Sequence, residues 1–337
     1  MSNLRYLENK RILFLSWNFY EYPKRIIEKI VELGGNVDFY NSSLTNNILL
    51  RKIYRLNRNS EKKYYNNILD STRKIHYDYL FIINAASFPI WFIEKLTKTV
   101  KNAKKVLYVW DSIERFPIIK DSIKYFDVTY TFDLDDAQNN EGMHFLPLFY
   151  CDEFALKNNQ SEKYIFSFIG YGYAERYKFI RKVRDFARKE GYSYLFRLYL
   201  PSYLYFIYGK YIKKNMEDAR LSDFYYKITK QKEICNILES TRIVVDLEQQ
   251  EQSGLTMRTI ETLGMKKKLI TTNKNIKKYD FYNPNNILVV DRVNPIISRE
   301  FVESDFKEVS KDIYEKYSLK AWIEAIFNDE VKGEKFD

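Results

Sequence analysis

Short apolar segments alternate with amphipathic segments along most of this chain, and this alternation limits the fold more than any other feature. The segment 11–16 (RILFLS) is continuously apolar, the segment 26–33 carries apolar residues at helical spacing, and 37–40 (VDFY) is apolar again. A strand, a helix and a second strand in this order predict a βαβ unit with parallel strands. Gly34 and Gly35 are expected to end the helix.

The same alternation continues to the end of the sequence. Apolar strands separated by helices indicate parallel sheets that are covered on both faces. The predicted strands are 79–84, 105–110, 128–132, 164–169, 194–200, 242–247, 268–272 and 287–291, and the predicted helices are 89–100, 118–125, 175–189, 229–239, 257–263 and 322–327.

A polar stretch at 151–163 separates two such series, and 337 residues are enough for two ordinary domains. We therefore predict an α/β protein with a Rossmann-like domain at 1–152 and a second one at 160–318. The last helix, within 319–337, is expected to pack back on the N-terminal domain. Two domains of this kind face each other across a cleft, and such clefts commonly hold ligands.

The composition argues against several classes of protein. The cysteines and histidines are two of each, isolated from one another, which argues against a disulfide framework or a structural zinc site. The N-terminus lacks an apolar signal segment, and no apolar run reaches the roughly 20 residues that span a bilayer. We therefore expect a soluble cytoplasmic protein.

The formal net charge of +10 suits anionic partners such as phosphorylated small molecules, anionic lipid or nucleic acid. Lysines and arginines are scattered along the chain, and no RNP, helix-turn-helix or zinc-finger pattern occurs. The sequence therefore argues against nucleic acid as a partner.

The segment 246–264 is the most informative one, because a polar, glycine-containing turn joins a predicted strand to a predicted helix. Free N–H groups and the dipole at a helix start favour a phosphate, and Arg258 can add a charge-assisted bond. Glu261, one turn later, can accept bonds from two ribose hydroxyls. The alternative is a capped surface helix with an Arg258–Glu261 pair.

The runs QSGLTMRTIETLGMKKKLITTN and YDFYNPNNILVVDR resemble the donor-nucleotide half of GT-B glycosyltransferases, above all the CgeB-like and the capsular or lipopolysaccharide biosynthesis enzymes. The upstream segments LYVWDSIERFP, YFDVTYTFDLDDA and FLPLFY resemble the same group, and the likeness extends from about residue 10 to about residue 327. It implies a GT-B fold with an N-terminal acceptor side and a C-terminal nucleotide-sugar side. It also implies transfer of a sugar from a nucleotide-sugar donor to a capsule, exopolysaccharide or lipopolysaccharide precursor.

The resemblance also implies donor-binding residues. Glu261 matches the ribose-binding glutamate, Arg258 matches the neighbouring basic position, and Arg176 matches a basic residue that meets the phosphates. For the glycines before Arg176 the alternative is a tight strand-to-helix connection, and for Arg176 it is a solvated helix face. The positions matched to the two phosphate loops are Gly170 and Gly172 in the first and Gly254, Leu255 and Thr256 in the second.

Many retaining GT-B enzymes have a carboxylate eight positions before the ribose glutamate, and Ser253 occupies that place here. Glu248 and Glu251 lie nearby but out of register. This departure favours an inverting mechanism, which needs a general base for the acceptor hydroxyl. Asp111 follows a predicted strand at its carboxyl end and is our candidate; its alternative role is a helix N-cap.

The run Asp133-Leu-Asp135-Asp136 contains a D-x-D pattern that can hold a divalent ion. In a GT-B layout helix N-termini and basic side chains neutralise the diphosphate instead. We therefore interpret Asp135 or Asp136 as the start of a helix and expect neither a metal nor a cofactor.

The segment Tyr199–Tyr211 (YLPSYLYFIYGKY) is unusually aromatic and is followed by Lys213 and Lys214. Aromatic side chains with lysines suit a lipid headgroup layer, where a glycan or lipid-linked glycan acceptor would be found. The predicted location therefore includes a peripheral one on the cytoplasmic face of the membrane. The alternative is that this segment belongs to the core.

Two other functions remain open at this stage. An enzyme of the same fold can transfer an alditol phosphate from a CDP-alditol donor. A non-enzymatic basic module can bind anionic lipid or nucleic acid, and it would do so with a steep salt dependence and without affinity for nucleoside diphosphates.

Overall fold

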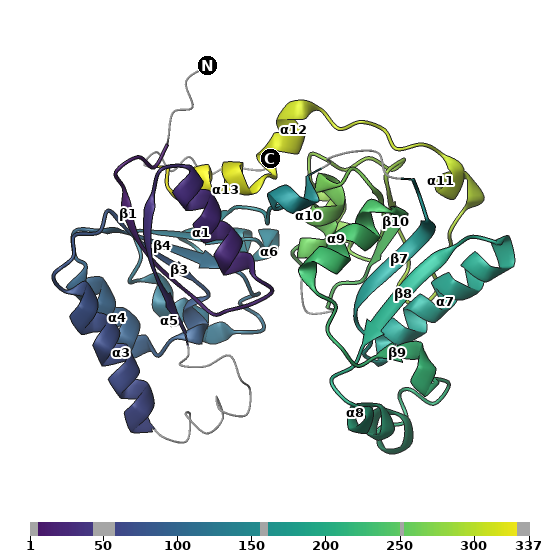
Figure 1. The fold of residues 1–337 in the computed structure, drawn as a ribbon, viewed down its shortest axis with the longest axis horizontal. Coiled ribbons are helices and arrows are strands. Elements are labelled where there is room, and N and C mark those ends of the chain that lie inside the picture. The colour runs from purple at the N-terminus through teal and green to yellow at the C-terminus, as the bar shows by residue number, and fades with distance from the viewer. Residues whose placement is uncertain (1–5, 43–57, 156–160, 250–252, 329–337) are drawn as a thin grey trace. The chain divides into compact units, whose positions relative to one another are not determined.

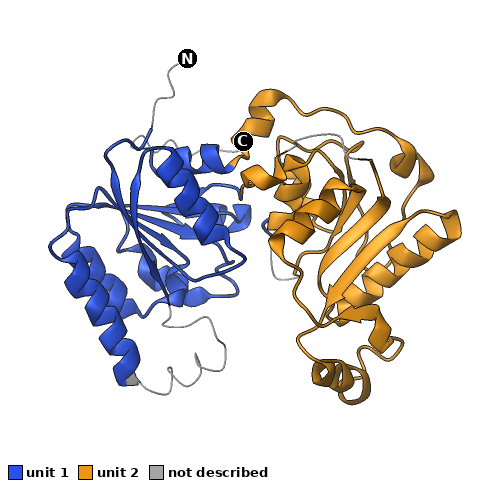
Figure 2. Cartoon of the chain, viewed as in Figure 1, with its two compact units in different colours: residues 1–148, 250–254, 319–337 blue, residues 149–249, 255–318 orange. Residues whose placement is uncertain are grey.

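The structure is a computed structural model, and it describes residues 6–42, 58–155, 161–249 and 253–328. The chain forms two compact units (Figure 2). The first unit comprises residues 1–148, 250–254 and 319–337, and the second comprises 149–249 and 255–318.

The first unit is built on a parallel sheet with the strand order β2-β1-β3-β4-β5-β6. Helices α1 and α13 contact each other on one face, and α3, α4 and α5 pack together on the other (Figure 1). The strands are β1 (Arg11–Ser16), β2 (Asn36–Asn41), β3 (Tyr79–Ile83), β4 (Lys104–Val109), β5 (Val128–Thr131) and β6 (Met143–Phe145). The helices are α1 (Tyr22–Glu32), α3 (Arg58–Thr72), α4 (Ile90–Thr99), α5 (Lys120–Ile123), α6 (Leu134–Asn139) and α13 (Leu319–Ile326).

Side chains that alternate along the buried strands form an apolar core on each face of this sheet. Leu13, Leu80 and Leu107 point toward α3 and α4 and belong to one apolar cluster with them. Phe14 and Phe81 lie on the opposite face, where their rings stack with centroids 5.0 Å apart. This burial on both faces explains why the strands are continuously apolar in sequence.

The last helix of the chain completes the first unit. Trp322 of α13 is 2% exposed and lies against Tyr108, with ring centroids 4.8 Å apart, and against Phe81 at 6.0 Å. The Tyr79 hydroxyl donates to the carbonyl of Phe327 at 3.1 Å. The C-terminal residues therefore cover the face that α1 leaves open.

The second unit has its own parallel sheet, with the order β12-β11-β10-β7-β8-β9. Phe166, Val183 and Val245 are among the buried residues that join this sheet to α7. The strands are β7 (Tyr164–Tyr171), β8 (Tyr194–Tyr199), β9 (Phe224–Tyr225), β10 (Thr241–Asp246), β11 (Lys268–Thr271) and β12 (Ile287–Val289). The helices are α7 (Ala174–Glu190), α8 (Tyr203–Ile207), α9 (Gln231–Glu239), α10 (Met257–Gly264), α11 (Arg299–Glu303) and α12 (Lys311–Lys316).

The strand order reverses direction once in each sheet, between β1 and β3 in the first unit and between β7 and β10 in the second. Loops that leave neighbouring strands at such a point run to opposite faces of the sheet and open a crevice at the carboxyl edge. Ligands of open α/β sheets bind there, so each unit has a defined place to search for a site. Within the described ranges no helix is long and apolar enough to cross a membrane.

Candidate functional site

The β7–α7 connection lies at the point where the second sheet reverses its order. Gly170 is within β7, and Gly172 joins that strand to α7. A Cβ on Gly172 would lie 2.9 Å from Cβ of Leu198 and 2.9 Å from the ring of Phe224. Packing against the neighbouring strands therefore requires glycine at 172, as expected for a tight strand-to-helix connection; its role beside a phosphate stays a prediction.

Arg176 lies in the first turn of α7, which is a helix of 17 residues. The N-cap residue is Tyr173, whose side chain makes no capping hydrogen bond. Arg176 is half-buried, and its guanidinium makes no hydrogen bond or ion pair with any residue that the structure describes. An uncapped helix N-terminus beside an uncommitted arginine is chemically suited to bind a phosphate group.

The β10–α10 connection is held by the buried carboxylate that ends β10. Asp246 accepts hydrogen bonds from the hydroxyls of Thr256 and Thr259, the latter at 3.0 Å. Thr256 is the N-cap of α10 and accepts from the Thr259 N–H at 3.2 Å. The side chain of Thr256 is therefore engaged in capping, and Leu255 is buried.

Arg258 and Glu261 form an ion pair on α10, with 2.7 Å between Nη1 and Oε2. The pair is the one expected from the alternative interpretation of this segment. However, Glu261 is only 2% exposed, so α10 is a buried helix and not a surface helix. A buried carboxylate held by a charged partner is a rigid hydrogen-bond acceptor.

Gly254 directly precedes Leu255 in the chain, but 253 and 254 belong to the first unit and contact residues of that unit. Its N–H donates to the Asp133 carboxylate at 2.9 Å, and the Ser253 hydroxyl donates to the same carboxylate. A Cβ on Gly254 would lie 2.5 Å from the Phe132 ring, so glycine is required for this approach. Leu255, Thr256, Arg258 and Glu261 thus belong to the second unit, whereas the N–H of Gly254 is committed to Asp133 of the first unit.

An additional charged cluster lies at the carboxyl edge of the second sheet. Glu248 is buried and accepts hydrogen bonds from the Thr272 hydroxyl at 2.6 Å and from the Arg292 guanidinium. Arg292 also lies 3.8 Å from Glu175 in the first turn of α7. Sequence reasoning missed Thr272 and Arg292, although each follows a strand within three residues, which is the position where edge residues occur. Glu251 lies outside the described residues.

In the first unit, Asp111 follows β4 and is held by Asn84, which directly follows β3. The Asn84 amide donates to Asp111, and its carbonyl oxygen accepts from the Trp110 N–H at 2.9 Å. Asn84 has a φ of 57°, a left-handed conformation that asparagine tolerates better than most residues. Burial raises the pKa of the Asp111 carboxyl, while the Asn84 hydrogen bond and Arg115 lower it.

Asp111 does not cap a helix in the structure. The Ile113 N–H donates to Asp136 at 2.8 Å instead, and the Glu114 N–H donates to the Ser112 hydroxyl at 3.2 Å. Neither contact involves Asp111. The capping alternative for this residue is therefore wrong, and its carboxylate is available for another role.

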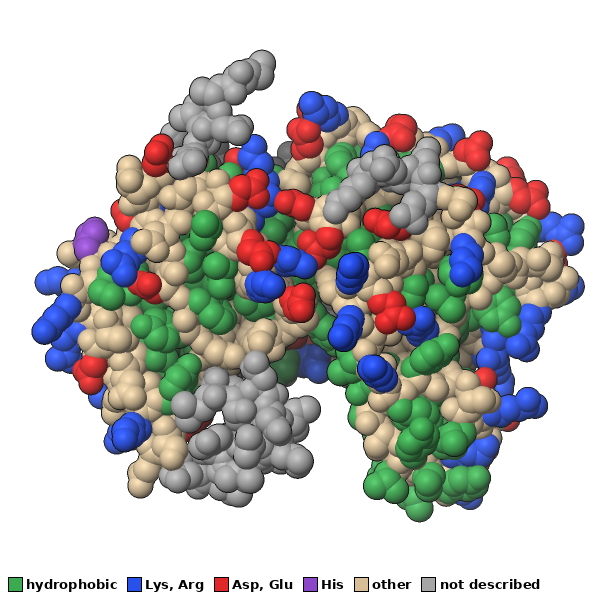
Figure 3. Space-filling view, viewed as in Figure 1, with side chains coloured by type: hydrophobic (Ala, Val, Ile, Leu, Met, Phe, Trp, Pro, Cys, Tyr) green, Lys and Arg blue, Asp and Glu red, His purple; other side chains and the backbone are tan. Residues whose placement is uncertain are grey.

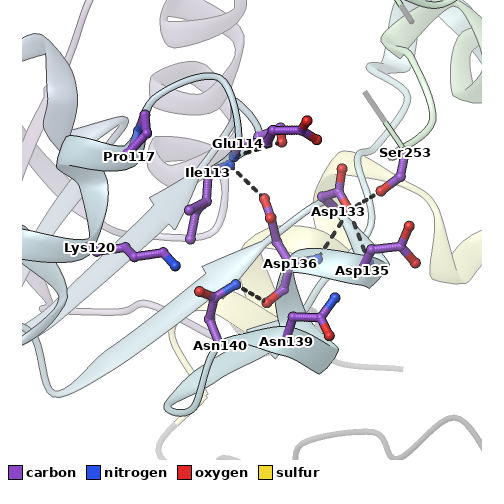
Figure 4. A pocket seen from close by; sticks show the side chains of 11 residues that line it. Ile113, Glu114, Pro117, Lys120, Asp133, Asp135, Asp136, Asn139, Asn140 and Ser253 are labelled. Atoms are coloured by element: carbon purple, nitrogen blue, oxygen red, sulfur yellow. Dashed lines mark hydrogen bonds between the residues drawn. The ribbon is translucent and has the colours of Figure 1, made fainter. Parts of the chain in front are cut away.

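A cavity of about 500 Å³ opens beside these residues in the first unit (Figure 4). Asp133 is the N-cap of α6 and accepts from the N–H groups of Asp135 and Asp136, so the helix begins at Leu134, before either of the two residues that were expected to start it. Burial, together with the neighbouring Asp133 carboxylate, raises the pKa of Asp136 to about 6, although the hydrogen bond from the Ile113 N–H opposes the shift. The residues that line the cavity are Ser112, Ile113, Glu114, Pro117, Lys120, Asp133, Asp135, Asp136, Asn139, Asn140 and Ser253.

The two oxygens of Asp133 are committed to four donors, two in α6 and two in the 253–254 segment. Asp133 of the D-x-D pattern therefore caps α6 and attaches the 253–254 segment. Among the described residues, no group of three or more His, Cys, Asp or Glu side chains is arranged to hold a metal ion.

Comparison with known proteins gives structural likeness only. No family model matches the sequence, and no curated protein matches it. The structure of Anabaena Alr3699/HepE in complex with UDP and glucose is similar, with a TM-score of 0.54 and 8% identity over 84% of this chain and 86% of that one. A trehalose-6-phosphate structure from E. coli bound with UDP-2-fluoro glucose has a TM-score of 0.56 and 11% identity over 94% and 97% of the two chains.

A trehalose 6-phosphate synthase from Burkholderia multivorans is similar too, with a TM-score of 0.51 and 11% identity over 94% of this chain and 93% of that one. At these identities the likeness concerns the fold. Because it extends over both units, it confirms the prediction of an α/β GT-B fold with two Rossmann-like domains.

Proposed function

We propose that this protein is a glycosyltransferase that moves a sugar from a nucleotide-sugar donor to a surface-polysaccharide precursor. The observation that carries the proposal is the α7 N-terminus with Arg176, an uncommitted cationic site at the order reversal of a Rossmann-like sheet. Two of the similar structures contain UDP or a UDP-sugar analogue, which supports a nucleotide-sugar as the donor.

The proposed donor site lies in the second unit. Arg176 and the α7 N-terminus bind the diphosphate, together with Leu255, Thr256 and Arg258 of the segment that follows Gly254, and Glu261 accepts hydrogen bonds from the ribose hydroxyls. Positive groups at the diphosphate stabilise the charge that develops on the leaving nucleoside diphosphate. This arrangement needs no metal.

The proposed catalytic base is Asp111 in the first unit, which we assign to the acceptor side. The acceptor hydroxyl oxygen attacks the anomeric carbon, the bond from that carbon to the diphosphate oxygen breaks, and the hydroxyl proton passes to Asp111. The carboxylate is half-buried and fixed by Asn84, and a raised pKa makes it a better proton acceptor. A direct displacement of this kind inverts the anomeric configuration.

The acceptor class rests on the sequence resemblance to capsular and lipopolysaccharide enzymes. A glycan or lipid-linked glycan fits that class, and so does a peripheral location at the membrane. The related alternative, transfer of an alditol phosphate from a CDP donor, uses the same diphosphate cradle with a different donor pocket. The resemblance of the 252–273 and 279–292 segments to sugar-nucleotide enzymes favours glycosyl transfer.

The test is calorimetric titration of the purified protein with UDP, GDP, TDP and CDP, followed by product analysis with the sugar nucleotide of the base that binds. A glycoside product supports the proposal, and NMR of the first product shows its configuration. A phosphoalditol product identifies the alternative enzyme. If no nucleotide binds and the protein instead binds anionic polymers with a steep salt dependence, the protein is a binding module.

A further inference from the structure

Exposed apolar side chains are concentrated in one short segment of the second unit. This segment, which we call the aromatic protrusion, is Tyr203–Lys214 and comprises α8, a π-helical turn at Tyr208–Ile212 and two lysines. The exposed fractions reach 76% at Leu204, 64% at Tyr211 and 68% at Ile212. Soluble proteins rarely expose an apolar surface of this kind without a partner.

The protrusion is anchored from its opposite side. Phe206 is 6% exposed and packs on Phe224 with ring centroids 5.7 Å apart. Ser202 caps α8 by accepting from the Tyr205 N–H at 3.2 Å. A helical segment normally buries its apolar face. Here the apolar side chains are exposed to solvent, while Phe206 and the Ser202 cap hold the segment in place. Of the segment 199–211, Leu200 and Phe206 belong to the core of the second unit, as the alternative to membrane contact expected, whereas most of the other apolar side chains are exposed.

Positive charge surrounds the apolar side chains (Figure 3). Between residues 199 and 232 there are seven lysines and arginines and only three acidic residues. Two of the acids, Asp218 and Asp223, pair with Arg181 and Arg184 of α7, so their charge is compensated within the unit. Lys210 and Lys213 lie over the rings of Tyr211 and Tyr208 at 5.9 and 5.6 Å.

We propose that the aromatic protrusion docks the protein on an anionic lipid surface. Tyrosines and lysines carry an apolar body with a polar end, and both place that end at headgroup level while the apolar part enters the acyl boundary. Lysines near the surface add electrostatic attraction to anionic headgroups. Protein interfaces, in contrast, are depleted in lysine. This inference is independent of the nucleotide site.

The test is flotation of the full-length protein with two kinds of vesicle, phosphatidylcholine alone and phosphatidylcholine with an equal part of phosphatidylglycerol. The wild type is expected to float with the anionic vesicles and to be released by salt. Leu204→Ser/Ile212→Ser and Lys213→Glu/Lys214→Glu should each weaken this partition by about tenfold or more, since both the buried apolar area and the cationic charge contribute.

Matched controls carry equal changes elsewhere in the second unit. Val293→Ser/Ile296→Ser removes two other exposed apolar side chains, 73% and 78% exposed, and Lys307→Glu/Lys311→Glu reverses two other exposed lysines. Both should float like the wild type. The proposal is overturned if the wild type ignores anionic vesicles, or if the protrusion variants bind them as well as the controls. It is also overturned if light scattering finds a wild-type dimer that the protrusion variants convert to monomers.

Discussion

Asn84 and Asp111 illustrate how two residues that are unremarkable in sequence form a defined unit in space. They lie 27 positions apart; Asn84 directly follows β3 and Asp111 lies two residues after the end of the neighbouring parallel strand β4, so the sheet brings them together at its carboxyl edge. Asn84 fixes the backbone at Trp110 and the carboxylate of Asp111 at the same time. A residue in this position is oriented before any ligand binds, which a base requires.

Replacing Asp111 with Asn should lower turnover by roughly 10²–10⁴-fold while donor affinity stays close to wild type. The base must be deprotonated to accept a proton, and burial raises the pKa of Asp111. Wild-type kcat/KM should therefore decrease as the pH is lowered, and the midpoint of this decrease should lie above the ordinary carboxyl pKa of about 3.9. The measurement is kcat/KM across pH, with the melting temperature of each variant. Asp121→Asn on α5 is the control for loss of one negative charge. Full activity of Asp111→Asn would remove the residue from the mechanism.

Replacing Glu261 with Gln should weaken nucleoside diphosphate binding by about 1–3 kcal/mol, because the amide is a poorer acceptor for ribose hydroxyls than a carboxylate. Calorimetric titration measures the change. Glu233→Gln on α9 provides the control, since Glu233 is also paired with an arginine but is half exposed. Equal nucleotide affinities of wild type and Glu261→Gln would contradict the ribose assignment, provided that the variant unfolds at the wild-type temperature.

At the scale of elements, α7 supplies both parts of the proposed phosphate site, its N-terminus and Arg176. Arg176→Ala should lower nucleoside diphosphate affinity and turnover together, because one charge-assisted contact of about 1.5–3 kcal/mol is lost. Lys178→Ala, on an exposed position of the same helix, should leave both unchanged. Transfer by the wild type should also persist in EDTA. If EDTA abolishes activity and Mg²⁺ or Mn²⁺ restores it, Asp135 and Asp136 become candidates for binding a divalent metal ion.

The regular elements were predictable to the extent that their own residues specify them. Buried parallel strands such as β1, β3 and β4 are apolar without interruption, and α7 has a helical apolar period, so both were predicted from sequence. The helix α3 was missed because its sequence RNSEKKYYNNILDST is mostly polar. The edge strands β6 and β9 were missed because three and two residues carry too little pattern.

The site was predictable only in part, for a related reason. Arg176, Arg258 and Glu261 belong to local strand–turn–helix patterns that sequence displays. The partner of Gly254 is Asp133, which lies 121 positions earlier, and Arg292 meets Glu248 from 44 positions away. Contacts of this range depend on the sheet order and are absent from any local pattern.

At the scale of the molecule, the position of α13 predicts where stability resides. Trp322→Ala should destabilise the first unit by about 3–5 kcal/mol, the cost of emptying a fully buried aromatic site. All four tryptophans, at 17, 91, 110 and 322, lie in that unit, so intrinsic fluorescence in urea follows its unfolding. Trp91→Ala, at a half-buried position of α4, should cost less. Similar losses in both variants would contradict the structural role assigned to α13.

The same helix has a consequence for how the protein is made. Domains generally fold in the order in which a ribosome releases them, the N-terminal one first. Here the N-terminal sheet keeps the face around Phe81 and Tyr108 uncovered until Trp322 has been synthesised. The second unit ends at residue 318, only four residues before Trp322, so both units become complete at nearly the same time. The N-terminal sheet should therefore keep an apolar face exposed for most of its synthesis, and it should be the part that needs protection from aggregation during translation.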